Sequence, residues 1–483
     1  MRPDRGWLAP ALLLTLLVTG LRVLGLAFNR TDLFVDEAQY WLWAQEPALG
    51  YYSKPPMIAW VIGGFTAVCG DSPFCIRLPA PIFHGATALI LGAVAAQLSG
   101  RRAALLVVAA WLTLPMVALA SLLISTDTIL FPFMALALWA YLACLRGAGP
   151  GVALLGGLAL GLGFLSKYAA VYYLLCALLA LGLRPRLDLR QAAGFLLGFV
   201  LAASPNILWN LGNGLTTVQH TLDNADWVRD PGAKASLNLA GLSEFFFSQF
   251  AVFGPVLFGT LLWLGAGWRN RPAELRRLLW FALPIVALVC GQALLSRAYA
   301  NWAATAYLAG TLAVIPWLAR NARAWLRVSF AVNMVFCLAF PLATVFADRL
   351  VVNGQPLLNR YLGRAEISRQ IIAEARKQGL TTVVAEDRDI LADLFYTGRD
   401  SGLDFRAVPS RGRAPHHYAL RYPLDPAGTE TVLWVAPADA VPRCDSSIPV
   451  GRLAPETGAY RNKPMQLYVT TPDCLCSPVP APG

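Results

Sequence analysis

The fold of this chain is decided by its first apolar run, since residues 8–28 read LAPALLLTLLVTGLRVLGLAF. A helix of this length crosses roughly 30 Å of hydrocarbon at about 1.5 Å per residue. Arg2 and Arg5 precede the run, as they would in a signal peptide. No small-x-small cleavage pattern follows, and further apolar runs come after it. We therefore interpret it as a retained membrane helix.

Similar runs recur through the first 345 positions, in a chain of 483 residues of which 57% are hydrophobic and 14% charged. The mean hydropathy of +0.53 is well above that of soluble globular proteins. We predict about eleven transmembrane helices, at 8–28, 77–98, 104–121, 127–145, 151–165, 168–183, 191–209, 246–267, 278–295, 302–318 and 325–346. From Asp348 onward no run is long enough to span. The expected fold is a polytopic α-helical membrane domain over 1–347 and a soluble domain over 348–483.

The loop charges predict the orientation of these spans. With the N-terminus inside, every inner loop is basic, as the positive-inside rule requires. The two long outer loops, 29–76 and 210–245, instead carry acids, Trp and Tyr. An odd number of spans then places the soluble tail outside, in the periplasm if the membrane is a bacterial inner membrane. The formal charge of +11 is thus explained by topology, and a nucleic-acid partner is not expected.

The first outer loop contains two amphipathic segments, 38–43 and 57–69, which we expect to be interfacial helices. Aromatic side chains accompany them, and we expect these at lipid headgroup depth: Trp41, Trp43, Tyr51, Tyr52 and Trp60. An ordinary aromatic belt is the alternative. It accounts for the rings but not for the acids and the lysine among them.

The tail is predicted to be a small α/β unit, with helices at 364–378 and 390–396 and strands at 381–385 and 431–435. It contains no nucleotide-binding loop. Disulfides are plausible between Cys69 and Cys75, and between Cys444 and either Cys474 or Cys476. A zinc site is less favoured, because His is scarce and the cysteine spacing fits no metal module.

Charged residues at the ends of membrane helices are costly and usually functional. Here they fall on the outer side: Asp36, Glu37, Lys54, Asp127, Lys167 and Arg297. One outward-facing cavity would explain this clustering. A lipid-linked sugar phosphate needs cations at its phosphate and a carboxylate near its sugar. Only five residues of the chain are lysines, which adds weight to Lys54 and Lys167, although both could be snorkelling anchors.

The acids also have alternatives. Asp36 could be a general base toward an acceptor hydroxyl, or could orient the nucleophile if the acceptor is itself a phosphate. Asp127, in Ser125-Thr126-Asp127-Thr128, could simply cap a helix. The second outer loop, with His220, Asp226 and Trp227, has the polar and aromatic composition of a sugar-binding wall, as would any ordered loop of that length. Tyr52 and His220 are the substrate contacts expected from the two loops.

Together these motifs resemble the GT-C glycosyltransferases, in the branch of the protein O-mannosyltransferases and the lipid A aminoarabinose transferases. The resemblance rests on motifs that occur in order along the membrane domain: Asp36-Glu37-Ala38-Gln39-Tyr40-Trp41, Tyr51-Tyr52-Ser53-Lys54-Pro55-Pro56, Arg77-Leu78-Pro79, Ser125-Thr126-Asp127, Gly163-Phe164-Leu165-Ser166-Lys167 and Ala300-Asn301-Trp302.

The resemblance implies an inverting transfer of a sugar from undecaprenyl phosphate to a cell-envelope acceptor, with Asp36 and Glu37 at the reaction centre and Lys54 and Lys167 at the phosphate. Lipid A or lipopolysaccharide is the expected acceptor, and a protein is the alternative. No cofactor is certain, although a divalent metal ion is possible. Arg297 is added from topology alone.

A transporter or flippase of lipid-linked sugars is the non-enzyme alternative. Transporters place charges near the bilayer midplane, often within repeated halves. We find no internal repeat and no charge well inside a predicted span, which favours the enzyme.

Overall fold

The computed structural model describes residues 5–224, 237–410, 412–441, 444 and 446–476. Asp226 and Trp227, two residues of the predicted sugar-binding wall, lie outside the described residues. The chain divides into two compact units. The first comprises Met1–Ala27 and Ala48–Leu342, and the second comprises Phe28–Pro47 and Ala343–Gly483.

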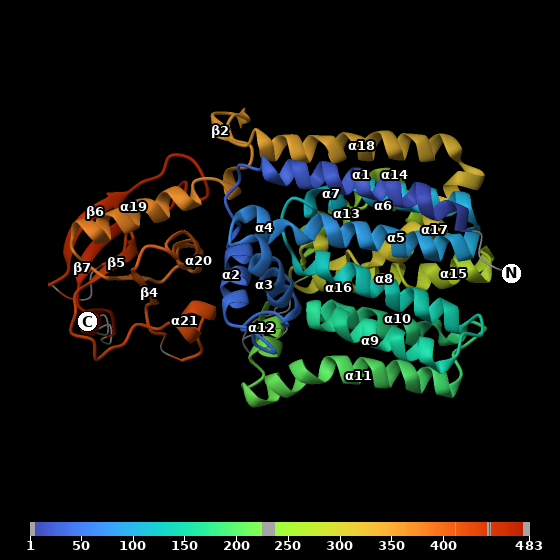
Figure 1. Ribbon diagram of the computed structural model, residues 1–483, viewed down its shortest axis with the longest axis horizontal. Coiled ribbons are helices and arrows are strands. Elements are labelled where there is room, and N and C mark those ends of the chain that lie inside the picture. Colours follow the sequence, from blue (N-terminus) through green and yellow to red (C-terminus); the bar gives the residue numbers. More distant parts are fainter. Residues whose placement is uncertain (1–4, 225–236, 411, 442–443, 445, 477–483) are drawn as a thin grey trace. The chain divides into compact units, whose positions relative to one another are not determined.

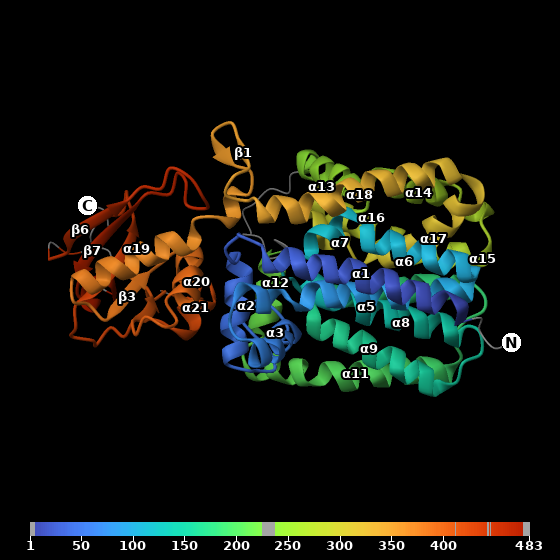
Figure 2. The ribbon, with the colours of Figure 1, turned by 45° about the horizontal axis from the view of Figure 1, so that its top comes forward.

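The first unit is a bundle of helices whose long members run side by side (Figures 1 and 2). Its core is built of apolar and aromatic side chains, including Trp111, Phe131, Phe258 and Tyr307. The helices, in chain order, are α1 Leu8–Ala27, α3 Met57–Cys69, α4 Pro73–Arg77, α5 Pro79–Ser99, α6 Arg101–Thr113, α7 Pro115–Ala120, α8 Thr126–Cys144, α9 Pro150–Ser166, α10 Val171–Leu179, α11 Leu189–Gly212, α12 Thr216–Asn224, α13 Leu239–Val252, α14 Pro255–Ala266, α15 Ala273–Trp280, α16 Leu283–Leu295, α17 Ala306–Asn321 and α18 Arg323–Val345.

Within the described residues, six helical segments are long and apolar enough to cross a membrane: Leu8–Ala27, Pro73–Ser99, Thr126–Cys144, Leu189–Gly212, Ala273–Leu295 and Arg323–Val345. A bent pair, α13 and α14, would make a seventh. Several of these segments leave apolar side chains uncovered; on α1, Leu13 and Leu16 are 70% and 68% exposed. Apolar faces of this size require lipid rather than water. The chain is therefore a multi-pass membrane protein.

The predicted span 246–267 is not one straight helix. It falls across α13 and α14, whose axes meet at 114°. Gly254 has a φ of +92° and Pro255 begins α14, so a left-handed residue and an imide without an N–H stand together at the break. Both features end a helix and start another. Apolar periodicity alone did not reveal this break.

Close helix packing is visible between α9 and α11. A Cβ atom built on Gly157 would lie 2.1 Å from the backbone oxygen of Phe195 on α11. The two backbones can therefore approach only because residue 157 has no side chain, which is how small residues bring membrane helices together.

Arg22 lies well inside the predicted span 8–28, so the expectation that no charge lies well inside a span is wrong. It belongs to α1, is only 3% exposed, and donates a hydrogen bond to the backbone oxygen of Leu112. A membrane-buried arginine is retained only where protein groups solvate it. Because Leu112 is 90 residues away, its carbonyl could not be anticipated from the sequence near Arg22.

The second unit contains a five-stranded mixed sheet of order β4-β3-β5-β7-β6 and a small hairpin of β1 Val351–Val352 and β2 Gln355–Pro356. The three parallel strands are β3 Thr382–Ala385, β4 Asp404–Ala407 and β5 Val432–Pro437. Strand β7 Met465–Thr470 is antiparallel to both β5 and β6 Ile448–Leu453. Residues 432–436 of β5 are all buried, as expected of a central strand covered on both faces.

The helices of this unit are α2 Val35–Gln45, α19 Arg364–Lys377, α20 Arg388–Thr397, α21 His417–Arg421 and α22 Pro472–Cys476. The sequence predicted α19, α20, β3 and β5, and these are confirmed. It missed β4 and β6, which are the two edge strands of the sheet, and β7, which lies between β5 and β6.

Helix α2 packs against α20 in the second unit. Trp41 meets the ring of Tyr396 edge-on at 5.1 Å between centroids, and Trp43 meets His417 edge-on at 5.6 Å. Both tryptophans are at most 4% exposed. Protein rings therefore cover both of these large side chains, and their depth relative to the lipid headgroups stays a prediction.

The predicted disulfides are confirmed and the open pairing is resolved. Cys69 is bonded to Cys75, and Cys444 is bonded to Cys474 rather than Cys476. The first joins the end of α3 to α4, and the second joins the segment ahead of β6 to α22.

Candidate functional site

The first unit contains a cavity of about 600 Å³ that brings several of the predicted substrate-binding residues together. Lys54, Lys167 and His220 all line it. The cavity has one strongly apolar wall, formed by α16 through Ala287, Leu288, Val289 and Leu295, and it is completed by Tyr168, Tyr172 and Trp302. Lys54 and Lys167 therefore line the same cavity as the apolar side chains of α16.

Lys167 follows the last residue of α9 and is held by an acid from α8. Its Nζ donates to both carboxylate oxygens of Asp127, at 2.8 and 2.9 Å. Asn301 adds a hydrogen bond from Nδ2 to Asp127 Oδ2 at 2.6 Å. The Lys167 and Asp127 side chains are 17% and 8% exposed. A pair this buried has a defined geometry, because leaving either charge alone would be costly.

The helix-cap alternative for Asp127 is resolved by Ser125. The Ser125 hydroxyl accepts the backbone N–H of Thr128 at 3.4 Å and is the N-cap of α8. Asp127 lies in the first turn, where a carboxylate is favoured by the helix dipole. The Asp127 carboxylate accepts hydrogen bonds from Lys167, and Ser125 caps the helix.

Tyr52 and His220 meet at the wall of the cavity, with ring centroids 5.0 Å apart in an edge-on arrangement. Tyr168, which also lines the cavity, is held in place because its hydroxyl donates to Asn206 Oδ1 at 2.9 Å and accepts from Asn210 Nδ2 at 3.1 Å. The segments predicted as outer loops, 29–76 and 210–245, thus both contribute residues to the lining of this cavity.

Arg297 lies beside the cavity rather than in its lining. It is exposed, and its Nε donates to the backbone oxygen of Asn224 at 3.3 Å. Asn224 itself lines the cavity. Arg297 is therefore adjacent to a lining residue but is not itself part of the cavity lining.

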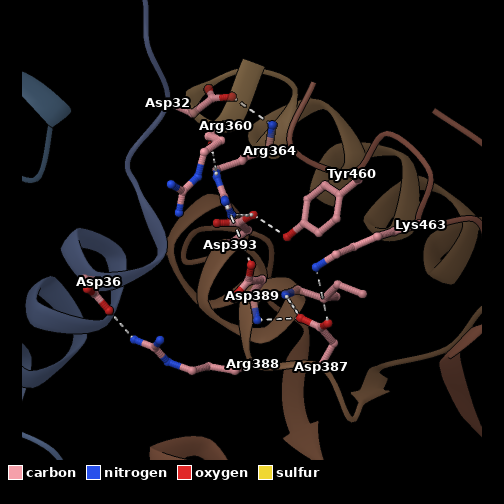
Figure 3. Close-up of polar contacts among 11 residues, drawn as sticks. Asp32, Asp36, Arg360, Arg364, Asp387, Arg388, Asp389, Asp393, Tyr460 and Lys463 are labelled. Carbon is pink, nitrogen blue, oxygen red and sulfur yellow. Dashed lines mark hydrogen bonds and ion pairs between the residues drawn. The ribbon is translucent and has the colours of Figure 1, made fainter. Parts of the chain in front are cut away.

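The acidic pair Asp36 and Glu37 belongs to the second unit, on α2. Figure 3 shows Asp36 and Arg388 of α20 pointing toward each other, with Arg388 Nη2 2.5 Å from Asp36 Oδ1. Arg388 Nε also donates to Gln39 Oε1 at 2.9 Å. Glu37 differs from its neighbour, because it is 1% exposed and its Oε2 accepts the backbone N–H of Phe34 at 2.9 Å. This contact caps the start of α2.

Sequence reasoning missed Arg388, which is 352 positions from Asp36. The structure adds a signal that the predicted helix from residue 390 did not contain, since Arg388 is the first residue of α20, where the helix dipole disfavours a cation. Although burial lowers the pKa of Arg388, the Asp36 carboxylate raises it above its usual value. Arg388 therefore remains charged and is a fixed partner for the acid.

Among the residues that the structure describes, no group of three or more His, Cys, Asp or Glu side chains could hold a metal ion.

Comparisons with known proteins agree with these features. A family model described as dolichyl-phosphate-mannose-protein mannosyltransferase matches residues 53–209, the segment that contains Lys54, Asp127 and Lys167. The chain is also 40% identical to the lipid A galacturonosyltransferase RgtD of Rhizobium johnstonii. That match extends over 472 residues, which are 96% of this chain and 98% of the relative.

Solved structures show the same fold. The apo form of ArnT from Cupriavidus metallidurans is similar with a TM-score of 0.62 and 16% identity, over 98% of this chain and 99% of ArnT. ArnT bound to undecaprenyl phosphate is similar with a TM-score of 0.64 and 15% identity, over 98% and 100% of the two chains.

Proposed function

The chain belongs to the GT-C glycosyltransferases, the family that includes the lipid A galacturonosyltransferase RgtD, and from this membership we propose that it transfers a galacturonosyl group from undecaprenyl phosphate to lipid A. The observation that carries the proposal is the cavity in which Lys54 and Lys167 stand beside the apolar face of α16. A polyprenyl-phosphate sugar has the same division into an anionic head and an apolar chain. ArnT, whose fold this chain shares, was solved bound to undecaprenyl phosphate.

Lys54 and Lys167 bind the phosphate of the donor in this proposal. As the bond from the sugar to the phosphate breaks, negative charge grows on the leaving phosphate, and preorganised cations stabilise it. An ammonium group has three N–H donors. Asp127 accepts two donors of Lys167, so one remains for the phosphate. Asp127 and Asn301 are then positioning residues for this cation.

Asp36 is the proposed general base. An acceptor hydroxyl oxygen attacks the anomeric carbon, the bond to the phosphate breaks with its electron pair leaving on the phosphate, and the hydroxyl proton passes to the carboxylate. The configuration at the anomeric carbon is inverted. If the accepting group is a phosphate of lipid A, no proton has to be removed, and Asp36 orients the nucleophile. The contact with Arg388 supports this role, since it fixes the direction of the carboxylate.

Glu37 is assigned to the cap of α2 in preference to catalysis, since its carboxylate is buried and accepts a backbone N–H. Tyr52 and His220 are proposed to contact the sugar, because His220 lines the cavity and the two rings meet. Arg297, beside Asn224, is proposed to attract the anionic donor at the edge of the cavity.

We also propose that the protein lies in a bacterial inner membrane with about eleven spans. The lysine cavity and the soluble domain, 348–483, would face the periplasm, and 1–347 would form the transmembrane domain. The basic inner loops and acidic outer loops support this orientation.

The test is transfer by the purified protein. Incubation with undecaprenyl-phosphate-linked galacturonic acid and lipid A should add the mass of one galacturonosyl group to lipid A, and Lys54→Ala should abolish the product. A synthetic Ser/Thr peptide is the second acceptor, because the family model is named for protein mannosyltransferases. Glycosylation of the peptide but not of lipid A would reassign the acceptor. Movement of the donor across vesicles without any transfer would overturn the enzymatic proposal.

A further inference from the structure

The order of strands in the second unit creates a crevice that the proposed reaction does not use. From β3 the chain passes through α20 to β4, on one side of β3, and then crosses to β5 on the other side. The connection after β3 therefore leads toward β4, and the connection after β5 leads toward the opposite edge of the sheet, where β6 lies. In open sheets with parallel strands, ligands bind in the crevice outside such a switch point.

A cavity of about 570 Å³ lies at this place. Asp387 enters its lining just after β3, and Asp439 just after β5. Asn462 and Lys463 line it ahead of β7, and Arg452 lines it from β6. Strand β7 is antiparallel to β5, so β7 starts at the edge of the sheet where β3 and β5 end. Strand β6 is antiparallel to β7, so β6 ends at that same edge.

Half of the lining residues are polar or charged, and most of these side chains are only loosely paired. Lys463 Nζ lies 4.0 Å from Asp387 Oδ2, longer than a hydrogen bond (Figure 3). In the part of the chain that the structure describes, Arg452 and Asp439 make no side-chain hydrogen bond or ion pair. The lining thus holds two cations, two carboxylates and an amide, and the 4.0 Å ion pair of Lys463 and Asp387 is the contact between them that the described residues show.

One side of the cavity is rigid. Tyr460 is 2% exposed, and its hydroxyl donates to Asp393 Oδ2 at 2.5 Å. Arg364 donates to the same Asp393 oxygen at 3.1 Å (Figure 3). The Tyr460 ring that lines the cavity is therefore held from behind, as a preformed ligand site requires.

A nucleotide does not suit this crevice. Phosphates at a switch point bind the backbone N–H groups of the first helical turn. Here Asp387 Oδ1 already accepts the N–H groups of Asp389 and Ile390, at 2.7 and 3.2 Å. The helix end is closed to an anion, so a ligand must rely on the side chains. Carboxylate and amide groups bind sugar hydroxyls, and Arg452 and Lys463 add charge for an acidic substituent.

We propose that this crevice binds a phosphorylated sugar, and, resting on the proposed function, that this sugar is the phosphorylated glucosamine of the lipid A acceptor. Arg452 and Lys463 bind the phosphate, while Asp387, Asp439 and Asn462 receive the hydroxyl and amino groups. The soluble domain then contributes to acceptor binding.

The experiment measures binding directly, by saturation-transfer NMR on the full-length protein in nanodiscs with glucosamine 1-phosphate. Glucosamine, inorganic phosphate and galacturonate are the matched probes. Glucosamine 1-phosphate should bind most tightly, and Arg452→Ala and Lys463→Ala should each weaken it about tenfold, the loss expected for one charge-assisted contact. Lys377→Ala is the control, because Lys377 is an exposed lysine of the same unit that pairs with Glu374 on α19.

Unchanged binding in Arg452→Ala and Lys463→Ala, or tighter binding of any other probe, would overturn the assignment. Asp439→Asn is a second variant that should fold normally, because it removes an exposed charge without changing the shape of the side chain. It should nevertheless weaken binding of glucosamine 1-phosphate. Because no transfer is needed, binding can be present when the proposed reaction is absent. If both hold, Arg452→Ala should raise the KM for lipid A about tenfold and leave kcat unchanged. Lys54→Ala should lose transfer but keep this binding.

Discussion

Two ion pairs, one in each unit, differ in how exposed they are and in which partner is proposed to contact the substrate. In the first unit Lys167 and Asp127 are 17% and 8% exposed, whereas in the second unit Arg388 and Asp36 are 36% and 44% exposed. In the proposed reaction the cation of the first pair contacts substrate and the acid holds it. In the second pair the acid contacts substrate and the cation holds it.

The difference in exposure determines what each pair can contribute. A buried pair is strongly coupled to folding, because breaking it leaves a charge without solvent. A half-exposed pair contributes little stability, so its arrangement is free to serve chemistry. Stability and activity should therefore respond in different ways to changes at the two places.

The largest effect is expected from Asp36→Asn. Loss of the base should lower kcat about a thousandfold, within the range for general base catalysis, and should leave the unfolding transition unchanged. The matched control is Asp348→Asn, which breaks the half-exposed pair of Arg30 and Asp348 in the same unit. Equal losses of activity in the two variants would remove Asp36 from the reaction.

Asp127→Ala should have the next largest effect, and on stability. It leaves Lys167 without its carboxylate, at a cost of about 3 kcal/mol, which is toward the low end for a broken buried pair because the ammonium borders a cavity. Chemical denaturation of the full chain measures the loss. The double variant Asp127→Ala, Lys167→Met should recover most of the stability while remaining inactive. A cost below about 1 kcal/mol for Asp127→Ala would mean that the pair behaves as an exposed one.

Acid should weaken the second unit selectively, through His417. Burial lowers the pKa of His417 to about 3, from 6.5 in the unfolded chain. The folded pKa is depressed, so the stability from the neutral ring is complete above pH 6.5 and is lost as pH falls toward 3. One such group removes about 2 kcal/mol by pH 5.

Since His417 packs against Trp43 of α2, hydrogen exchange of α2 and α21 at pH 7 and pH 5 should detect this loss. His416 also has a lowered pKa, because of burial, so the relevant quantity is the difference between wild type and His417→Phe. Identical pH slopes for the two proteins would contradict the prediction.

The smallest effect is expected from Arg388→Ala. It frees the Asp36 carboxylate without removing it, so kcat should fall about tenfold, or 1.4 kcal/mol, while the KM for the donor stays the same. Arg388→Lys should restore part of the rate, since a cation returns without the second hydrogen bond to Gln39. An unchanged pH–rate profile in Arg388→Ala, together with full activity, would assign Arg388 to structure alone.

The sequence predicted the parts of this fold that depend on local pattern. Segment 57–69 was recognised as a helix, and α19, α20, β3 and β5 were placed within a few residues, because apolar periodicity reports which face of a segment is covered. It also selected Lys54, Lys167 and His220, which line one cavity. Rare residue types beside aromatics at the ends of apolar runs were a sufficient signal.

The tertiary structure alone decided which of these residues have partners. Asp127 is 174 positions from Asn301, and Asp36 is 352 from Arg388, so no local pattern links them. The same holds for the crevice beside β3 and β5, whose lining is brought together by strand order. Amphipathic pattern is fixed by neighbours along the chain, whereas charge pairing depends on which distant segments the packed core brings together.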